Sequence, residues 1–501
     1  MALLSGPVST LELRNGISLI LLGIAVYALF SVTDYIRDPL KSVPGPIAAR
    51  YTRLWWFFKT RKGDFHLENI ELHRKYGNVV RIAPNVYSID DLEATKIIYG
   101  HRSKFLKSEW YSTFTLSDVA DVNTFTLRDA KKHAAVRRLF ANNYAMSSMI
   151  HYEAYVDTCI RTFQDALLKR SAEKQKMDMG DWLQYYAFDV IGNITFGKSF
   201  GFVEKGEDIN NMMAELDQAN LYGSLGGIFP SLYAFVMRFA IYPMQGIGDW
   251  VMDAINERRK KIAKGEHTPK DDQGTEDFLD KNLKAHELNP TVFTAMHLLF
   301  GTAGNIFAGS DTTSIALSAI VFHLWANPSC LSKLREEINE ASKEGMVSDP
   351  ITFAESQELP YFQAVLKEGL RINPSVGLPL VRVVPPGGAT LCGKFFPAGT
   401  VVGINSWVAH HNRIIFGPDA GSFRPERWLE GVTPEMERYF MPFGMGSRSC
   451  LGKNISLLEM GKLIPQLVRN FDFDLERTDK LVANNWWFVK PKGFMATPRK
   501  L

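Results

Sequence analysis

Residues 442–464 read PFGMGSRSCLGKNISLLEMGKLI, and this stretch of the 501-residue chain decides its fold. Three glycines surround Cys450 just before an apolar helical run: Gly444, Gly446 and Gly452. Glycine permits a tight loop with unusual dihedral angles, so successive backbone N–H groups can point at the sulfur. The positive end of the following helix and the nearby Arg448 both favour a thiolate. The stretch therefore predicts a loop that keeps Cys450 ionised without a second cysteine.

The spacing F-G-x-G-x-R-x-C-x-G resembles the haem-binding loop of the cytochrome P450 superfamily, whose iron carries an axial cysteine thiolate. All its fixed positions are present: Phe443, Gly444, Gly446, Arg448, Cys450 and Gly452. The resemblance implies haem b (iron protoporphyrin IX), with Cys450 as the metal ligand and Phe443 beside the cofactor. It covers the chain from end to end. The sequences of the loop and of INSWVAHHN (404–412) resemble those of fungal secondary-metabolism enzymes of the pisatin demethylase type.

An acid and an alcohol stand side by side in AGSDTT (308–313), as Asp311 and Thr312. By resemblance, this pair delivers protons during oxygen activation, with the hydroxyl holding a water and the acid relaying from solvent. The alternative is that Thr312 bonds back to a helix carbonyl and Asp311 forms a surface pair. The haem loop favours the catalytic role.

The segment KEGLR (367–371) places Glu368 and Arg371 three residues apart, on one face of a helix. On its own such a pair is usually a surface salt bridge. By resemblance it is part of a buried network with an arginine of FRPERW (423–428). We expect Arg427 to be that arginine, with Arg424 as the alternative. Such a network fixes geometry more than it adds stability.

Haem propionates need cationic or hydrogen-bonding partners. The segment HAAVRR (133–138) takes the place of the family's W-x-x-x-R, with His133 where the family has tryptophan. Histidine still offers a ring N–H. His133 and Arg137 of this segment are expected to hold propionates. By resemblance, so are Arg382 and Arg448 of two later segments.

The N-terminal region contains no charge between Arg14 and Asp34, and about 19 uncharged residues are just long enough to cross a bilayer as a helix. A cleaved signal peptide is the alternative, although the run is long for one. Several basic residues follow the run, which predicts a cytoplasmic body. We expect a single-pass anchor over residues 1–38 in the endoplasmic reticulum membrane and a catalytic domain over 39–501.

The fold is expected to be mainly α with small β-sheets, the cytochrome P450 fold. Helical periodicity covers Glu68–Tyr76, Ala130–Asn143, Met149–Arg170 and Trp182–Phe196. VVRIAP and VYSID predict a hairpin, and further strands are expected within Val381–Val402, near Phe471–Leu475 and near Phe494–Thr497. A long central helix is expected to start at Asn289-Pro290 and to end at Ala326.

Composition narrows the function. The 57 basic and 54 acidic side chains nearly balance, which argues against nucleic acid as a partner. The four cysteines are far apart, with no zinc or disulfide spacing. No flavin or nicotinamide motif is present, so NADPH is expected to act only through a cytochrome P450 reductase.

Substrate contacts are expected, by position in the family, from four apolar segments: Trp110–Phe125, Phe300–Ala308, Val376–Leu380 and Trp487–Val489. They suit a lipophilic small molecule. The apolar stretch Ile228–Met244 either dips into the membrane surface or forms a buried helix.

Together these features predict a membrane-anchored haem monooxygenase that inserts one oxygen atom from O₂ into a lipophilic molecule, in secondary-metabolite biosynthesis. Two other functions remain open. A haem-thiolate isomerase or dehydratase would consume a peroxide and need no reductase. A haem sensor or carrier would leave the Asp311–Thr312 pair without a use.

Overall fold

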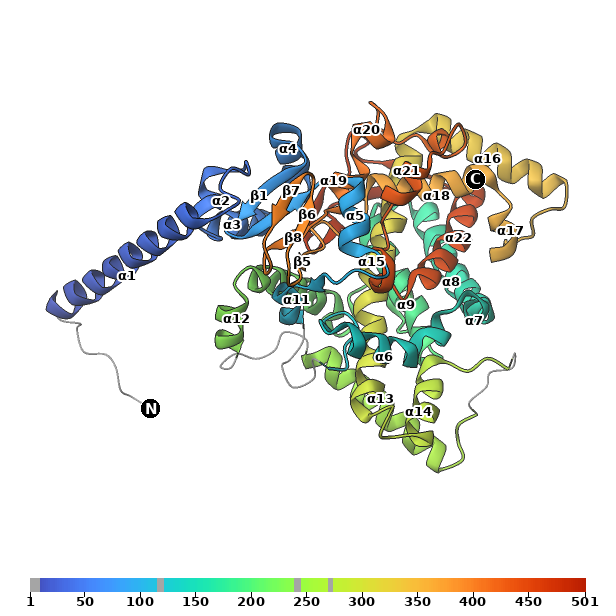
Figure 1. Ribbon diagram of the computed structural model, residues 1–501. Coiled ribbons are helices and arrows are strands. Elements are labelled where there is room, and N and C mark those ends of the chain that lie inside the picture. Colours follow the sequence, from blue (N-terminus) through green and yellow to red (C-terminus); the bar gives the residue numbers. More distant parts are fainter. Residues whose placement is uncertain (1–9, 115–120, 238–244, 269–273) are drawn as a thin grey trace.

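The structure is a computed structural model that describes residues 10–114, 121–237, 245–268 and 274–501. It is mainly helical with small sheets, as predicted. The labelled strands lie together on the side of the N-terminal helix, whereas the C-terminus, which follows the last strand, lies on the opposite side, so the sheets are not all set to one side (Figure 1). The helices are α1 (Thr10–Arg37), α2 (Ile47–Tyr51), α3 (Leu54–Lys62), α4 (Phe65–Tyr76), α5 (Leu92–Tyr99), α6 (Ala130–Phe140), α7 (Met146–Met149), α8 (Glu153–Glu173), α9 (Met179–Phe196), α10 (Phe202–Lys205), α11 (Met212–Ile228), α12 (Pro230–Met237), α13 (Gln245–Ala263), α14 (Phe278–Leu288), α15 (Ala295–Ala326), α16 (Pro328–Lys343), α17 (Phe353–Gln357), α18 (Pro360–Ile372), α19 (Ser406–His410), α20 (Arg413–Phe416), α21 (Pro434–Tyr439) and α22 (Lys453–Asn470).

The strands form a five-stranded sheet in the order β1-β2-β8-β5-β3 and three smaller sheets, β4-β12-β9, β6-β7 and β10-β11. Their bounds are β1 (Val79–Ala83), β2 (Val86–Ile89), β3 (Leu106–Lys107), β4 (Met177–Asp178), β5 (Arg382–Val383), β6 (Ala389–Leu391), β7 (Lys394–Phe396), β8 (Val401–Gly403), β9 (Phe471–Leu475), β10 (Ala483–Trp486), β11 (Phe488–Pro491) and β12 (Met495–Lys500). The predicted hairpin is confirmed, because β1 and β2 pair antiparallel with Val80 opposite Ser88.

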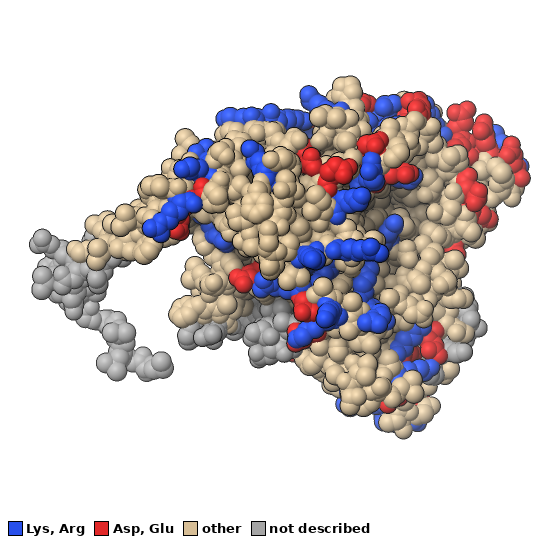
Figure 2. Space-filling model, in the orientation of Figure 1, with Lys and Arg blue, Asp and Glu red and all other residues tan. Residues whose placement is uncertain are grey.

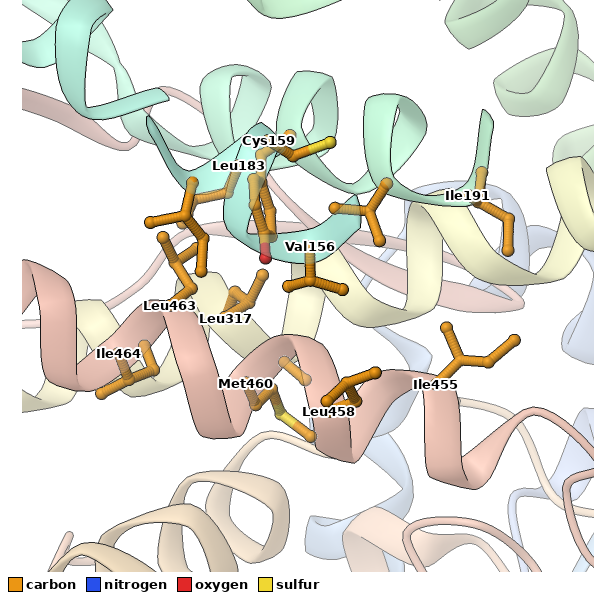
Figure 3. Packing of buried hydrophobic residues seen from close by; sticks show 14 of the residues in the cluster. Val156, Cys159, Leu183, Ile191, Leu317, Ile455, Leu458, Met460, Leu463 and Ile464 are labelled. Atoms are coloured by element: carbon orange, nitrogen blue, oxygen red, sulfur yellow. The ribbon is translucent and has the colours of Figure 1, made fainter. Parts of the chain in front are cut away.

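Helix α15 is the centre of the helical core. Its side chains meet those of α8, α9 and α22, and Figure 3 shows Val156, Leu183, Leu317 and Leu463 from these four helices packed together. All four side chains are completely buried. Burying a side chain of this size contributes roughly 1.5–3 kcal/mol. The core therefore holds α15 rigidly, although glycines and hydroxyl residues weaken its middle.

The start of α15 differs from the prediction. Asn289 caps the C-terminus of α14, and α15 begins five residues later than Pro290, at Ala295. Thr294 caps it, with its hydroxyl accepting the His297 N–H at 3.4 Å and the His297 ring accepting the Thr294 N–H at 3.1 Å. A histidine takes the place of the usual glutamate of a capping box, which hides this start from a sequence reading. The predicted end at Ala326 is confirmed.

Helix α1 extends away from the body, and its described side chains are largely exposed (Figure 1). Leu29 and Phe30 are 69% and 66% exposed, values unusual for such apolar side chains. At the base of the helix, Asp38 binds the buried Arg81 of β1 at 2.6 Å. Among the described residues, α15 is the helix that passes a length-and-hydropathy criterion for crossing a membrane, but 72% of its apolar window is buried in the protein.

The apolar stretch Ile228–Met244 is described as far as Met237. Ile228 is buried, whereas α12 has no buried residue and exposes Leu232, Phe235 and Val236. The buried-helix alternative is therefore wrong for α12. Residues 238–244 lie outside the described residues.

Candidate active site

The Cys450 loop is a tight turn that glycines make possible. The Cys450 N–H bonds the Phe443 carbonyl at 2.8 Å and closes the loop. Gly444 and Gly446 both have positive φ, +67° and +60°. A Cβ at Gly446 would collide with the carbonyl oxygen of Tyr99. This position needs glycine for two reasons, the left-handed backbone and the close approach of α5.

Backbone donors do face the sulfur, as predicted. Burial raises the pKa of the Cys450 thiol, while the N–H groups of Gly452 and Lys453 and the charge of Arg137 oppose that rise. That the loop keeps Cys450 ionised stays a prediction. A thiol that coordinates a metal is deprotonated outright, so this donor set fits a metal ligand.

Cys450 opens into a cavity of about 330 Å³ that also contains Thr312. All four segments expected to touch substrate contribute to its wall, although residues 115–120 lie outside the described residues. The aromatic side chains of the wall are Tyr111, Phe114, Phe125, Phe307, Phe443, Trp487 and Phe488. Helix α11 also contributes, through Leu216, Ala219 and Asn220, and the sequence did not point to it.

The cavity is lined by three cations, Lys107, Arg382 and Arg448. None of the described lining residues is acidic. Arg382 bonds the Tyr111 hydroxyl at 3.2 Å, and Arg448 bonds backbone carbonyls, including that of Arg128 at 3.0 Å. Burial and the charge of Arg382 lower the pKa of Arg448 to about 10. We call these three residues the cation cluster.

Lys107 was missed in the sequence. It lies 6% exposed on β3, donates to the Phe125 carbonyl and sits over the rings of Tyr111 and Phe125, 4.4 and 4.5 Å from their centres. Burial and the charges of Arg382 and Arg448 hold the pKa of Lys107 well below its usual value. A dianionic group such as the two propionates of haem would neutralise this repulsion. In the sequence, the only sign of Lys107 as a cavity residue is its place just before an aromatic run.

The other two residues expected to hold propionates lie behind the cavity wall, on α6. His133 is buried, and burial together with the charges of Arg448 and Lys107 lowers its pKa to about 3. The ring is therefore neutral and has one N–H to donate. Arg137 donates to the Ser449 carbonyl at 2.8 Å, next to Cys450. Neither lines the cavity.

Glu368 lies fully buried between two arginines. Arg371 binds it with two bonds of 2.8 Å, and Arg427 binds it at 3.0 Å. Arg424 gives Glu368 only its backbone N–H, and its half-exposed side chain pairs with surface carboxylates. Although burial opposes it, Arg371 and Arg427 hold the pKa of Glu368 below its usual value. The arginine that pairs with Glu368 is thus Arg427, and Trp428 adds a ring N–H at 2.9 Å.

The acid and the alcohol of α15 face different surroundings. Thr312 lines the cavity, and its hydroxyl donates to the Ala308 carbonyl at 2.6 Å. Asp311 is 1% exposed and lies behind the cavity wall, so it makes no surface pair. Gln184 of α9 and Asn220 of α11 donate to its two carboxylate oxygens. Burial raises the pKa of Asp311 to about 6, which suits a group that exchanges protons near neutral pH.

Comparison with known proteins places this geometry in a family. The cytochrome P450 family model matches residues 44–499. Pisatin demethylase of Fusarium vanettenii is 40% identical over 99% of this chain and 97% of its own length. A cytochrome P450 monooxygenase of Aspergillus terreus is 37% identical over 94% and 97%, and the monooxygenase cicH of Emericella nidulans is 36% identical over 93% and 96%.

The family implies haem with thiolate ligation, and the cavity fits that group, since a thiol and three cations, with no acid among the described lining residues, line one space. The chain therefore belongs to the cytochrome P450 family and is a monooxygenase of the fungal type.

Proposed function

We propose that the protein inserts one oxygen atom from O₂ into a lipophilic small molecule bound in the cavity. The observation that carries this proposal is that one apolar cavity contains both Cys450 and Thr312. A haem sensor or carrier needs the thiol but not an acid and an alcohol beside it. A peroxide-consuming isomerase needs no proton supply to oxygen.

Haem bound by Cys450 would supply the redox chemistry that activates oxygen. The cation cluster would hold its propionates, with His133 and Arg137 supporting that edge from α6. Phe443 lies in the same wall and would pack against the ring. The network of Glu368, Arg371 and Arg427 fixes the segment before the Cys450 loop, because its three charges are satisfied only in one arrangement.

The roles of Asp311 and Thr312 are proton supply. The Thr312 hydroxyl oxygen can accept a hydrogen bond from water while the hydroxyl still donates its own proton to the Ala308 carbonyl. With a pKa of about 6, the Asp311 carboxyl can both take a proton from solvent and pass one on at neutral pH.

The substrate class follows from the aromatic wall, which favours a lipophilic molecule with few polar groups. A relative carries the name pisatin demethylase, and the relatives are fungal. We propose a secondary metabolite such as a polyketide, a terpene or an alkaloid.

Electrons would come from NADPH through a reductase in the endoplasmic reticulum membrane, because cytochromes P450 of this kind need a redox partner. Residues 1–38 would be the single-pass anchor and residues 39–501 the cytoplasmic catalytic domain. The exposed apolar surface of α1 supports this arrangement, and away from the body the described part of that arm shows hardly any charge (Figure 2). A chain lacking residues 1–38 should leave the membrane fraction on carbonate washing. Full retention would place membrane binding elsewhere, for example on α12.

Thr312→Ala tests the reaction. With reductase and NADPH, the variant should still bind haem and consume NADPH, but release more hydrogen peroxide and form roughly a hundredfold less product per NADPH. Thr313→Ala is the matched control, since the buried Thr313 does not itself line the cavity, although its hydroxyl bonds Ser456 of the cavity wall at 2.8 Å. Unchanged coupling in Thr312→Ala would favour the peroxide-consuming isomerase.

A further inference from the structure

Two amide side chains from different helices hold the carboxyl of Asp311. Gln184 of α9 donates to Oδ1, and Asn220 of α11 donates to Oδ2 at 3.1 Å. Asp311 is not part of the cavity wall, whereas its neighbour Thr312 is. In this arrangement the acid is directed at α9 and α11, so it has to turn or recruit water before it can serve Thr312.

Helix α11 contributes both to the cavity wall and to the hydrogen bonds of the Asp311 carboxyl. Leu216, Ala219 and Asn220 are three and four residues apart, so they share one helix face, and that face lines the cavity. Asn220 is the residue of this face that also bonds Asp311. A molecule that fills the cavity therefore presses on the helix that holds the acid.

Charge on the same helix reaches Asp311 as well. One turn before Asn220, Asp217 binds Lys490 of β11 at 2.8 Å, and both side chains are partly open to solvent. Asp217 and Lys490 act in opposite directions on Asp311: the lysine lowers the pKa of Asp311, and Asp217 raises it. Asp181 of α9 also faces Lys490 and raises the pKa of that lysine, after Asp311 and Asp217.

Gln184 shows that the site suits both protonation states. Its Oε1 is buried and has no hydrogen-bond partner in the part of the chain that the structure describes. When Asp311 is ionised, the Gln184 N–H bonds it. When Asp311 is protonated, a rotated amide offers Oε1 as the acceptor of the new O–H.

We propose that Asn220, Asp217 and Lys490 are positioning residues that couple the α11 wall of the cavity to the proton-donating carboxyl of Asp311. Substrate pressing on α11 displaces the Asn220 amide and frees Oδ2 to turn toward Thr312. The proton that Asp311 gives up is replaced from solvent at the partly exposed Asp217–Lys490 pair. No electron moves in this step. The inference rests on the proposed role of Asp311 in proton supply.

The test is the pH dependence of uncoupling in the full-length holoenzyme with reductase. The readout is the fraction of NADPH electrons released as hydrogen peroxide, without ligand and with 7-ethoxycoumarin as a lipophilic probe. This fraction should rise with pH, as Asp311 loses its proton. Lys490→Met should move the midpoint up and Asp217→Asn should move it down, each by roughly half a pH unit, about a threefold change in proton occupancy.

Asn220→Ala should move the midpoint up and remove the difference between the curves with and without the probe, and Asn220→Gln should restore part of that difference. Lys492→Met is the charge control, because Lys492 is exposed just beyond β11. Asn282→Ala is the amide control, since Asn282 is buried against α15 but bonds Thr302. Both controls should keep the wild-type midpoint.

The outcomes separate the two proposals. If Asp311→Asn and Thr312→Ala leave the peroxide fraction unchanged, proton supply by this pair is wrong, and the inference falls with it. If those two raise the fraction while Lys490→Met and Asp217→Asn shift the midpoint alike or not at all, only the coupling is wrong. Each variant is compared at equal content of thiolate-bound haem, and Lys490→Gln replaces Lys490→Met if that variant fails to bind haem.

Discussion

Two groups of buried cations in this protein differ in whether a carboxylate lies beside them. Around Glu368, the guanidinium groups of Arg371 and Arg427 share a carboxylate. Their other N–H groups donate to backbone carbonyls and, from Arg427, to the carboxylate of Asp419. In the cation cluster, Lys107, Arg382 and Arg448 have only carbonyls, a hydroxyl and aromatic rings as partners, among the described residues.

The difference distinguishes charges that stabilise the fold from charges that suit the binding of a ligand. A buried ion costs several kcal/mol to remove from water, and a fold recovers that cost only when an opposite charge lies close by. The Glu368 network contains its own opposite charge. Among the described residues, the cation cluster has no carboxylate in its cavity wall, so it suits an anionic ligand. Charge balance therefore supports the same cofactor site as Cys450 does.

The largest effect is expected for Cys450→Ala, which removes the thiol and leaves the cation cluster intact. All monooxygenase activity should disappear, together with the thiolate-type absorption band of the reduced carbon-monoxide complex, because other ligands lack the sulfur's electron donation. If the cluster binds the propionates, some haem should still copurify. Cys392→Ala is the control, because Cys392 is half-buried and does not line the cavity. A retained thiolate-type band would refute the assignment of Cys450.

Glu368→Ala should break the balanced network. It leaves the buried Arg371 without an opposite charge, whereas Arg427 keeps Asp419 at 3.2 Å, and the expected loss is about 3–5 kcal/mol in the free energy of unfolding. Thermal unfolding measures it. Arg424→Ala is the matched control, because that side chain is 42% exposed and pairs only at the surface, where loss of a pair costs about 1 kcal/mol or less. Equal losses in both variants would contradict the distinction between Arg427 and Arg424.

The smallest effect on stability is expected for Lys107→Met. Removing one of three like charges relieves repulsion, which offsets the lost bond to the Phe125 carbonyl. The unfolding temperature of the haem-free protein should therefore stay the same or rise, while haem transfers faster to apomyoglobin. Lys104→Met, an exposed lysine of the same segment, should change neither quantity. A destabilised haem-free protein with unchanged haem transfer would make Lys107 a structural residue.

Local patterns in the sequence were reliable where one segment carries the whole feature. The Cys450 loop, the β1–β2 hairpin and the end of α15 depend on neighbouring residues, and all three match the structure. The start of α15 was misread because Thr294 and His297 form an unusual cap. Lys107 and α11 were missed because nothing in their own segments shows that they turn toward Cys450.

By itself, the sequence determined the family and the order of the motifs and predicted the haem ligand, because these reside in short runs of fixed spacing. Only the tertiary structure decided which charges are balanced. It brings Arg427 to Glu368 across 59 residues and Asn220 to Asp311 across 91, and it gathers three cations around one cavity whose described lining contains no acid. The physical reason is that electrostatic energy depends on distance and burial in space, and the chain fixes neither until α9, α11 and α15 have packed.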